Sequence, residues 1–126
     1  MLETFFEERA GYFHFVFRAI VGVIFLLHGI MKVPGITAGT MPALMIVAGF
    51  IEVVGGLLLL LGLFTRYVAI IASIEMIVAY AMAHLPGGLD PLANKGEPAV
   101  LLFAAFLVLM AYGPGKLALE SVLFEK

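Results

Sequence analysis

The chain has 126 residues, of which 63% are hydrophobic and 13% are charged. A soluble domain carries roughly 25% charged residues, so this chain cannot cover a water-facing surface and is predicted to have lipid as its main solvent. The net charge of −2 gives no reason to expect nucleic-acid binding. The lack of cysteine excludes disulfides, thiolate catalysis and cysteine-ligated iron–sulfur clusters.

Four apolar segments predict a single domain, residues 1–126, that folds as an antiparallel four-helix transmembrane bundle. A helix crosses a hydrocarbon core of about 30 Å with roughly 20 residues. The first apolar segment has no small-residue cleavage site, so we expect it to be retained as a membrane anchor. Turn-forming residues at Pro34–Gly35, Thr65–Arg66 and Pro86–Gly88 separate the segments. The predicted spans are about 12–33, 43–64, 67–85 and 98–112, with an interfacial lead-in at 1–12 and an interfacial amphipathic tail at 114–126.

One face of the first span is polar or small, and we expect it to face the protein interior. Small residues let helices approach closely in lipid, and the other faces of this span are formed by large apolar side chains. The residues of this face fall within a stripe of roughly 80° on a helical wheel: His14, Arg18, Gly22, Phe25, Gly29 and Lys32.

Glu52 is the central feature of the second span, because it is the one carboxylate in a long apolar run and falls near the middle of the membrane. A carboxylate at that depth is costly in lipid, so it must face other helices, a cavity or a partner. Gly49 and Gly56 share its face. Two interpretations remain open: a structural charge that fixes helix packing, or a proton donor and acceptor for a redox ligand.

The third span is predicted to have two polar faces. Ser73, Tyr80 and His84 share one face, whereas Glu75 points roughly the opposite way near mid-depth. We therefore expect Glu75 to need a second partner, and Arg18 and Glu75 are the candidates for ion pairing, either within the chain or across subunits.

The polar residues of the four spans predict a ligand pocket that opens on the non-cytoplasmic side, with Glu52 at its floor. His28 and Lys32 lie on adjacent helical turns and are candidates to bind an anionic or carbonyl-bearing head group, with His84 and Glu97 at the rim. The alternative is that Lys32 extends outward to the interface, His84 marks a helix boundary and Glu97 caps the fourth span. No metal site is predicted, because there is no Glu-x-x-His pair and the candidate ligands differ in depth.

The distribution of basic residues predicts that both termini are cytoplasmic. Four spans place the termini and the Thr65–Arg66 turn on one side of the membrane. That side holds five basic residues against two on the other, and cytoplasmic loops carry the excess of Lys and Arg. The five are Arg9, Arg18, Arg66, Lys116 and Lys126, and the two are Lys32 and Lys95.

Several short motifs follow one another along about residues 18–120. They are Phe25-Leu-Leu-His28-Gly29-Ile-Met-Lys32, Glu52-Val-Val-Gly55-Gly56, Gly62-Leu-Phe-Thr-Arg66, His84-Leu-Pro86, Gly96-Glu97-Pro98 and Gly113-Pro114-Gly115-Lys116. In these motifs the chain resembles the DoxX family of small four-span membrane proteins. Two features depart from the family pattern: no aromatic residue separates Glu97 from Pro98, and Glu75 stands where the family is mostly apolar.

The resemblance implies a protein of the bacterial or archaeal cytoplasmic membrane, and the family takes its name from a subunit of a quinone-linked oxidoreductase. The first functional hypothesis is therefore an accessory subunit of a membrane redox system, with a quinone as candidate ligand and Glu52 exchanging a proton. It is favoured over a stand-alone enzyme because the sequence has no flavin or haem motif. The alternatives are a structural or assembly subunit, which the position of Glu75 on the opposite face of the third span favours, and a small-solute or ion transporter. Besides lipid, the expected partners are other membrane subunits or further copies of the chain.

Overall fold

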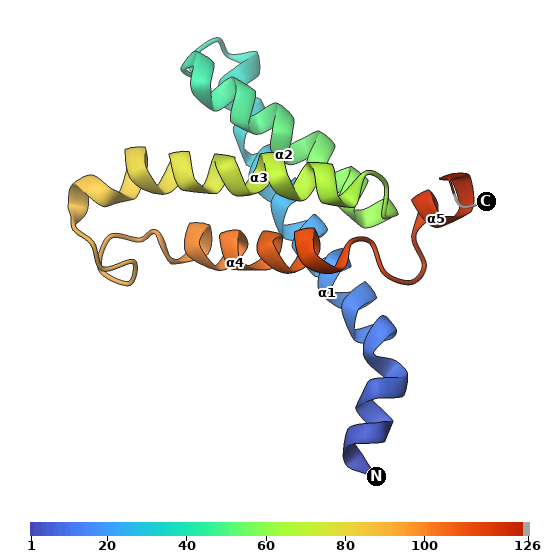
Figure 1. Ribbon diagram of the computed structural model, residues 1–126. Coiled ribbons are helices and arrows are strands. Elements are labelled where there is room, and N and C mark those ends of the chain that lie inside the picture. Colours follow the sequence, from blue (N-terminus) through green and yellow to red (C-terminus); the bar gives the residue numbers. More distant parts are fainter. Residues whose placement is uncertain (125–126) are drawn as a thin grey trace.

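The computed structural model describes residues 1–124, which form helices and connecting segments without a β-strand (Figure 1). Three helical stretches, including the third helix with its extension to Gly87, are long and apolar enough to cross a membrane, and the fourth helix is apolar but shorter. The elements are α1 (Leu2–Thr37), α2 (Ala43–Leu61), α3 (Thr65–Ala79), a π-helical turn (Tyr80–His84), a 3₁₀ turn (Leu85–Gly87), α4 (Glu97–Tyr112) and α5 (Leu119–Phe124).

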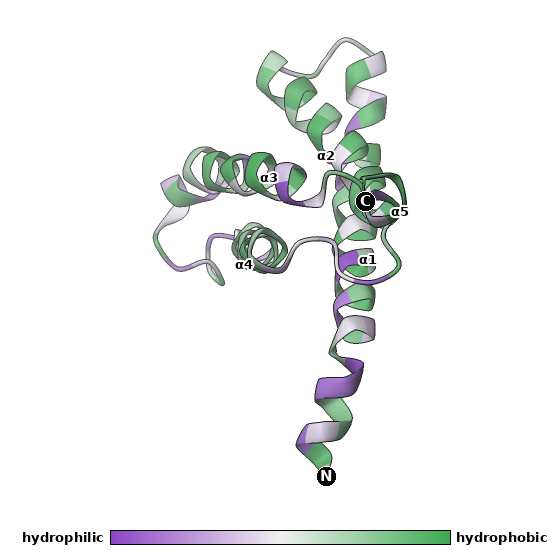
Figure 2. Cartoon of the chain, turned by 45° about the vertical axis from the view of Figure 1, so that its right-hand side comes forward, coloured by the Kyte–Doolittle hydropathy of each residue, from purple (hydrophilic) through white to green (hydrophobic). Residues whose placement is uncertain are grey.

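The four apolar helices form two pairs of consecutive helices. Helix α1 packs mainly against α2, and α3 mainly against α4. Figures 1 and 2 show that the α3–α4 pair lies across the α1–α2 pair instead of running along it. The prediction of an all-helical protein is confirmed, but the arrangement of all four spans side by side in one antiparallel bundle is not. Figure 2 also shows that hydrophilic residues are concentrated in the first turns of α1 and in the α3–α4 loop.

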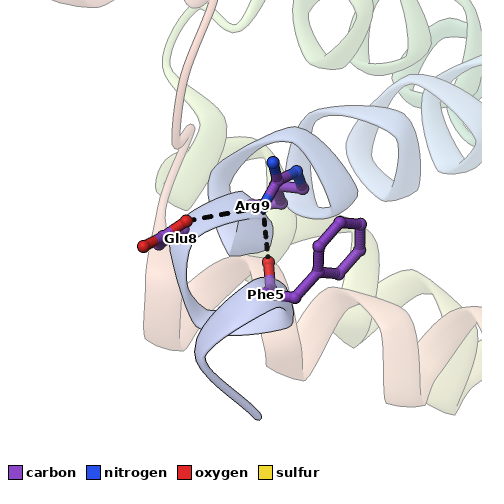
Figure 3. A network of polar contacts seen from close by, with 3 residues as sticks. All are labelled: Phe5, Glu8 and Arg9. Carbon is purple, nitrogen blue, oxygen red and sulfur yellow. Dashed lines mark hydrogen bonds and ion pairs between the residues drawn. The ribbon is translucent and has the colours of Figure 1, made fainter. Parts of the chain in front are cut away.

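Helix α1 is longer at both ends than the predicted span of about 12–33. Its 36 residues correspond to about 54 Å, well beyond the hydrocarbon thickness. Residues 1–10 are exposed and project away from the other helices (Figure 1). In Figure 3, Arg9 contacts the carbonyl oxygen of Phe5 and the carboxylate of Glu8 on the same helix. At the other end the helix continues past Pro34. Pro34 has no N–H to donate, but its carbonyl accepts a hydrogen bond from the N–H of Ala38 at 3.0 Å.

Glycines on the facing sides of α1 and α2 bring the two backbones together. A Cβ atom placed on Gly56 would lie 2.6 Å from the backbone nitrogen of Leu26, and one on Gly29 would lie 2.7 Å from that of Val53. Such distances leave no room for a side chain, so the two backbones touch at these points. The predicted inward orientation of this face of the first span is therefore confirmed.

The turn between α2 and α3 lies three residues earlier than predicted. Helix α2 ends at Leu61 because Gly62 adopts a left-handed conformation with φ of +68°. This allows the N–H of Leu63 to donate to the carbonyl of Leu58 at 2.8 Å. Thr65 and Arg66, predicted to form the turn, instead begin α3.

Arg18 joins α1, the end of α2 and the segment that follows α4. Its side chain is fully buried. Its guanidinium donates to the carbonyl oxygens of Leu59 at 2.9 Å, Leu117 at 3.0 Å and Lys116 at 3.2 Å, and also to that of Pro114. Arg18 was predicted to form an ion pair or a subunit contact. Within residues 1–124 it forms no ion pair, because its donors are used on backbone carbonyls.

The segment after α4 is docked on the protein by further contacts. Glu120 accepts a hydrogen bond from the backbone N–H of Thr65 at 3.2 Å, and its own N–H donates to Gly62 at 3.1 Å. His14 contacts the carbonyl of Gly113 at 2.7 Å. Within residues 114–124 of the predicted interfacial tail 114–126, only Leu119–Phe124 is helical, and Glu125 and Lys126 lie outside the described residues.

The hydrophobic core lies where the two helix pairs cross. Phe25 of α1 and Phe106 of α4 are both fully buried, and their rings meet edge to face with centroids 5.0 Å apart. Leu59 of α2 and Ala69 and Ala72 of α3 complete this contact region. In water, burying one large apolar side chain of this kind contributes roughly 1.5–3 kcal/mol to stability. This small core joins the two helix pairs, and most of the outer surface is apolar and suited to lipid.

Candidate functional site

A cavity of about 740 Å³ lies between the two helix pairs, towards the ends joined by the α1–α2 and α3–α4 loops. Its walls come from α1, α2, α3, the π-helical turn and the start of α4, and most of them are apolar. The ionisable residues that line it are His28, Lys32, Glu52, Glu75, His84 and Lys95. Ligand pockets are typically about 300–1,000 Å³ and mostly apolar, with a few polar groups that orient the ligand.

An ion pair between Lys32 and Glu52 forms one wall of the cavity. The Lys32 Nζ atom lies 2.6 Å from Glu52 Oε2, and the two side chains are 16% and 6% exposed. Lys32 also donates to the carbonyl of His28 at 3.4 Å. The pair can form because Gly29 and Gly49 keep α1 and α2 close on either side of it. A buried carboxylate is thus matched by a cation from the neighbouring helix, which lowers the cost of its burial.

Glu75 lines the same cavity as Glu52 and His84, although helical spacing placed it on the face opposite His84. Both of its carboxylate oxygens are buried, and neither has a hydrogen-bond partner among residues 1–124. Like Arg18, Glu75 forms no ion pair within these residues. The structure therefore brings a second carboxyl group, without a partner of its own, to the site that Lys32 and Glu52 occupy.

The π-helical turn explains why Glu75 and His84 reach one cavity. Nine residues at about 100° each would place them on opposite faces of a regular α-helix. In the π-helical turn Tyr80–His84 each residue turns the chain by less than that, because its hydrogen bonds span five residues. His84 is therefore rotated back towards the face of Glu75.

The α3–α4 loop is held against this turn by Asn94. The Asn94 side chain donates to the Tyr80 hydroxyl at 3.0 Å and to the carbonyl of Gly88 at 2.9 Å. Its backbone carbonyl lies 3.1 Å from His84 Nδ1. Because a carbonyl oxygen can only accept, Nδ1 is the donor, and the His84 ring is fixed in place by the loop.

Of the remaining predicted site residues, His28 lines the cavity beside Lys32 and Glu97 does not line it. Glu97 is exposed at the first position of α4, where its charge suits a helix N-terminus. Lys95 lines the rim of the cavity instead. Sequence reasoning missed it because its position depends on the loop conformation, in which Lys95 itself has φ of +64°. Among the described residues, no three His, Asp or Glu side chains are grouped closely enough to hold a metal ion.

Comparison with known proteins decides the family. The DoxX family profile matches residues 13–85, which is more than half of the chain and includes α1 from Phe13, all of α2 and α3, and the π-helical turn. This chain belongs to the DoxX family. Five of the six ionisable cavity residues lie inside the matched region: His28, Lys32, Glu52, Glu75 and His84.

Two relatives extend the DoxX match over nearly the whole chain. A protein of Haemophilus influenzae, described as uncharacterized, is 38% identical over 130 residues, which covers 95% of this chain and 97% of the relative. A protein of Bacillus subtilis named "Putative oxidoreductase CatD" is 32% identical over 117 residues, which covers 86% of this chain and 84% of the relative. No solved structure matches this DoxX protein.

Proposed function

We propose that this protein is an accessory subunit of a quinone-linked redox system in the bacterial cytoplasmic membrane, and that its cavity binds the head group of a quinone-like molecule. The observation that carries the proposal is the Lys32–Glu52 ion pair in the wall of a mostly apolar cavity. An ionisable group inside a membrane is costly and is usually functional. The oxidoreductase name of the Bacillus relative supports the redox assignment.

In this proposal, His28 and Lys32 contact the head group and Glu52 exchanges a proton with it. Interconversion of a quinone and its hydroquinone moves protons as well as electrons, so a carboxylate beside the ligand has a chemical role. The electrons would come from or go to a partner protein, which is why we propose a subunit and not a complete enzyme. The apolar walls suit the ring and tail of a lipid-soluble ligand.

The charge distribution supports an orientation with both termini in the cytoplasm and the cavity towards the outer side. Four basic residues lie towards the end of the molecule where α1 begins and α4 finishes: Arg9, Arg18, Arg66 and Lys116. Lys32 and Lys95 line the cavity near the other end. An excess of basic residues marks the cytoplasmic side.

The alternative of an assembly subunit loses the feature that favoured it, because Glu75 lines the cavity together with His84 and does not point to the opposite side. Contacts with other subunits stay part of the proposal, since an accessory subunit needs a redox partner. The exposed first turns of α1 are available for such a contact.

The test is quinone binding by the purified protein in nanodiscs. We expect decyl-benzoquinone to bind the wild type, and Glu52→Gln and Lys32→Met to weaken binding by about tenfold, which corresponds to the loss of one hydrogen bond to a charged group. Glu8→Gln is the matched control, because Glu8 is exposed near the start of α1. Equal affinity of the wild type and Glu52→Gln would remove the role of Glu52, and no binding by the wild type would overturn the quinone site.

A further inference from the structure

The uncommitted polar atoms of the cavity are mostly hydrogen-bond acceptors. Glu75 contributes the clearest case, since its two carboxylate oxygens are buried and have no partner within residues 1–124. In its ionised form the Glu75 carboxylate can only accept, and burying it in that form without a donor is unfavourable. A ligand that donates to Glu75 would remove this cost.

The Lys32–Glu52 pair leaves the same imbalance. Lys32, the cation buried in this site, is already engaged by Glu52 Oε2 and by the carbonyl of His28. Glu52 Oε1 receives no hydrogen bond from any described residue. Lys32 therefore uses two of its three N–H donors within the protein, and the pair leaves Glu52 Oε1 as an acceptor for the ligand.

His84 adds another acceptor. Its Nδ1 donates to the carbonyl of Asn94, so in the neutral ring Nε2 carries no proton and can only accept. The His28 ring offers one donor and one acceptor, and Lys95 supplies donors from an exposed position at the rim. Three side chains from α2, α3 and the π-helical turn thus present acceptors to one cavity.

We infer that the cavity selects amphiphiles whose polar head donates protons, and that Glu75 is the specificity-determining residue. Two head groups share this chemistry: the hydroquinone, with two hydroxyl donors, and a protonated primary amine. A quinone carries only carbonyl acceptors on the same ring and is the poorer match. Hydrogen bonds from such donors to a carboxylate are charge-assisted and strong. The inference rests on the proposed function for the place of the site, and it assigns the reduced form of the ligand as the preferred one.

The experiment compares matched ligands on the full chain in nanodiscs. One pair is decyl-hydroquinone and decyl-benzoquinone, measured under reducing and oxidising conditions respectively. The other pair is decylamine and decyltrimethylammonium, which carry the same charge but differ in whether the head donates. The expected result is at least about tenfold tighter binding of the donating member of each pair by the wild type, as for one charge-assisted hydrogen bond.

Variants then show which residue produces the preference for donating head groups. Glu75→Gln keeps the size of the side chain, and we expect it to reduce both ratios to about threefold or less, whereas Glu8→Gln leaves them unchanged. The wild-type ratios test the inference even where Glu75→Gln folds poorly. A quinone bound as tightly as its hydroquinone by the wild type would overturn it, and so would equal binding of the two cations. If the amine pair shows the preference while neither ring compound binds, the donor selectivity stands and the quinone-linked function fails.

Discussion

Lys32 and Glu52 form their ion pair directly beside a close approach of α1 and α2 at Gly29. A Cβ atom on Gly29, one turn before Lys32, would lie 3.0 Å from the Cβ atom of Glu52. The short distance between the helices is therefore what lets Lys32 Nζ reach to within 2.6 Å of Glu52 Oε2. The packing of small residues and the polar site are one feature, so changes in either should affect both.

Replacing Lys32 with Met should destabilise the protein by about 3 kcal/mol, because it leaves the Glu52 carboxylate buried without a cation. The double variant Lys32→Met/Glu52→Gln should recover most of this loss, since it removes both charges. Thermal unfolding in detergent, followed by circular dichroism, measures both. If the double variant loses as much unfolding free energy as the two single variants lose together, the two side chains do not interact.

Replacing Gly56 with Ala should force α1 and α2 apart. The new methyl group would meet the backbone nitrogen of Leu26 at 2.6 Å, and backbone cannot move aside as a flexible side chain can. We expect a loss of about 1–3 kcal/mol of stability and weaker ligand binding, because the Lys32–Glu52 pair opens.

The control for this variant is Gly87→Ala. There the nearest atom to a new Cβ is Cβ of Asn94 at 3.6 Å, which is an ordinary contact. It should change stability by no more than about 0.5 kcal/mol. Equal effects of the two substitutions would mean that the close approach of α1 and α2 is not what Gly56 provides.

The sequence predicted the helices and the inward face of the first span well, because both depend on local patterns. Long apolar runs indicated membrane-crossing helices, and the period of the small residues indicated which face of α1 meets α2. A mid-membrane carboxylate had to be buried, and Lys32 was the basic residue predicted to face the same interior. These inferences used only spacing along one or two helices.

The parts that the sequence did not reveal depend on geometry that the residue pattern does not contain. Regular α-helical spacing placed Glu75 and His84 on opposite faces, and the π-helical turn brings them to one cavity. The partners of Arg18 are backbone carbonyls, and every residue has one, so no residue type signals them. The crossing of the two helix pairs likewise follows from contacts between distant segments.

The orientation of the chain in the membrane can be tested by labelling of single cysteines, since the sequence contains no cysteine of its own. Asp90→Cys in the α3–α4 loop should react with a membrane-impermeant maleimide in intact cells. Glu8→Cys near the start of α1 should react only after the membrane is permeabilised. Both positions are exposed, so the difference reports the side of the membrane. The reverse pattern would place the cavity towards the cytoplasm.

Arg18→Lys should release the segment that follows α4. A lysine keeps the charge but has a single ammonium group, which cannot reproduce the planar set of donors that Arg18 directs at four carbonyl oxygens. We expect a loss of about 3 kcal/mol, as for a buried charge that loses part of its hydrogen bonding. Hydrogen exchange in nanodiscs should show faster exchange across residues 113–124.

Arg66→Lys is the matched control for the Arg18 variant. Arg66 also donates to two backbone carbonyls, those of Met110 at 3.1 Å and Ala111 at 3.3 Å, but it is exposed. Water can replace those hydrogen bonds, so the cost should be at most about 1 kcal/mol. If Arg18→Lys protects residues 113–124 as well as the wild type does, the buried guanidinium is not what docks this segment. The hydrogen bond between Glu120 and Thr65 would then be the contact to test next.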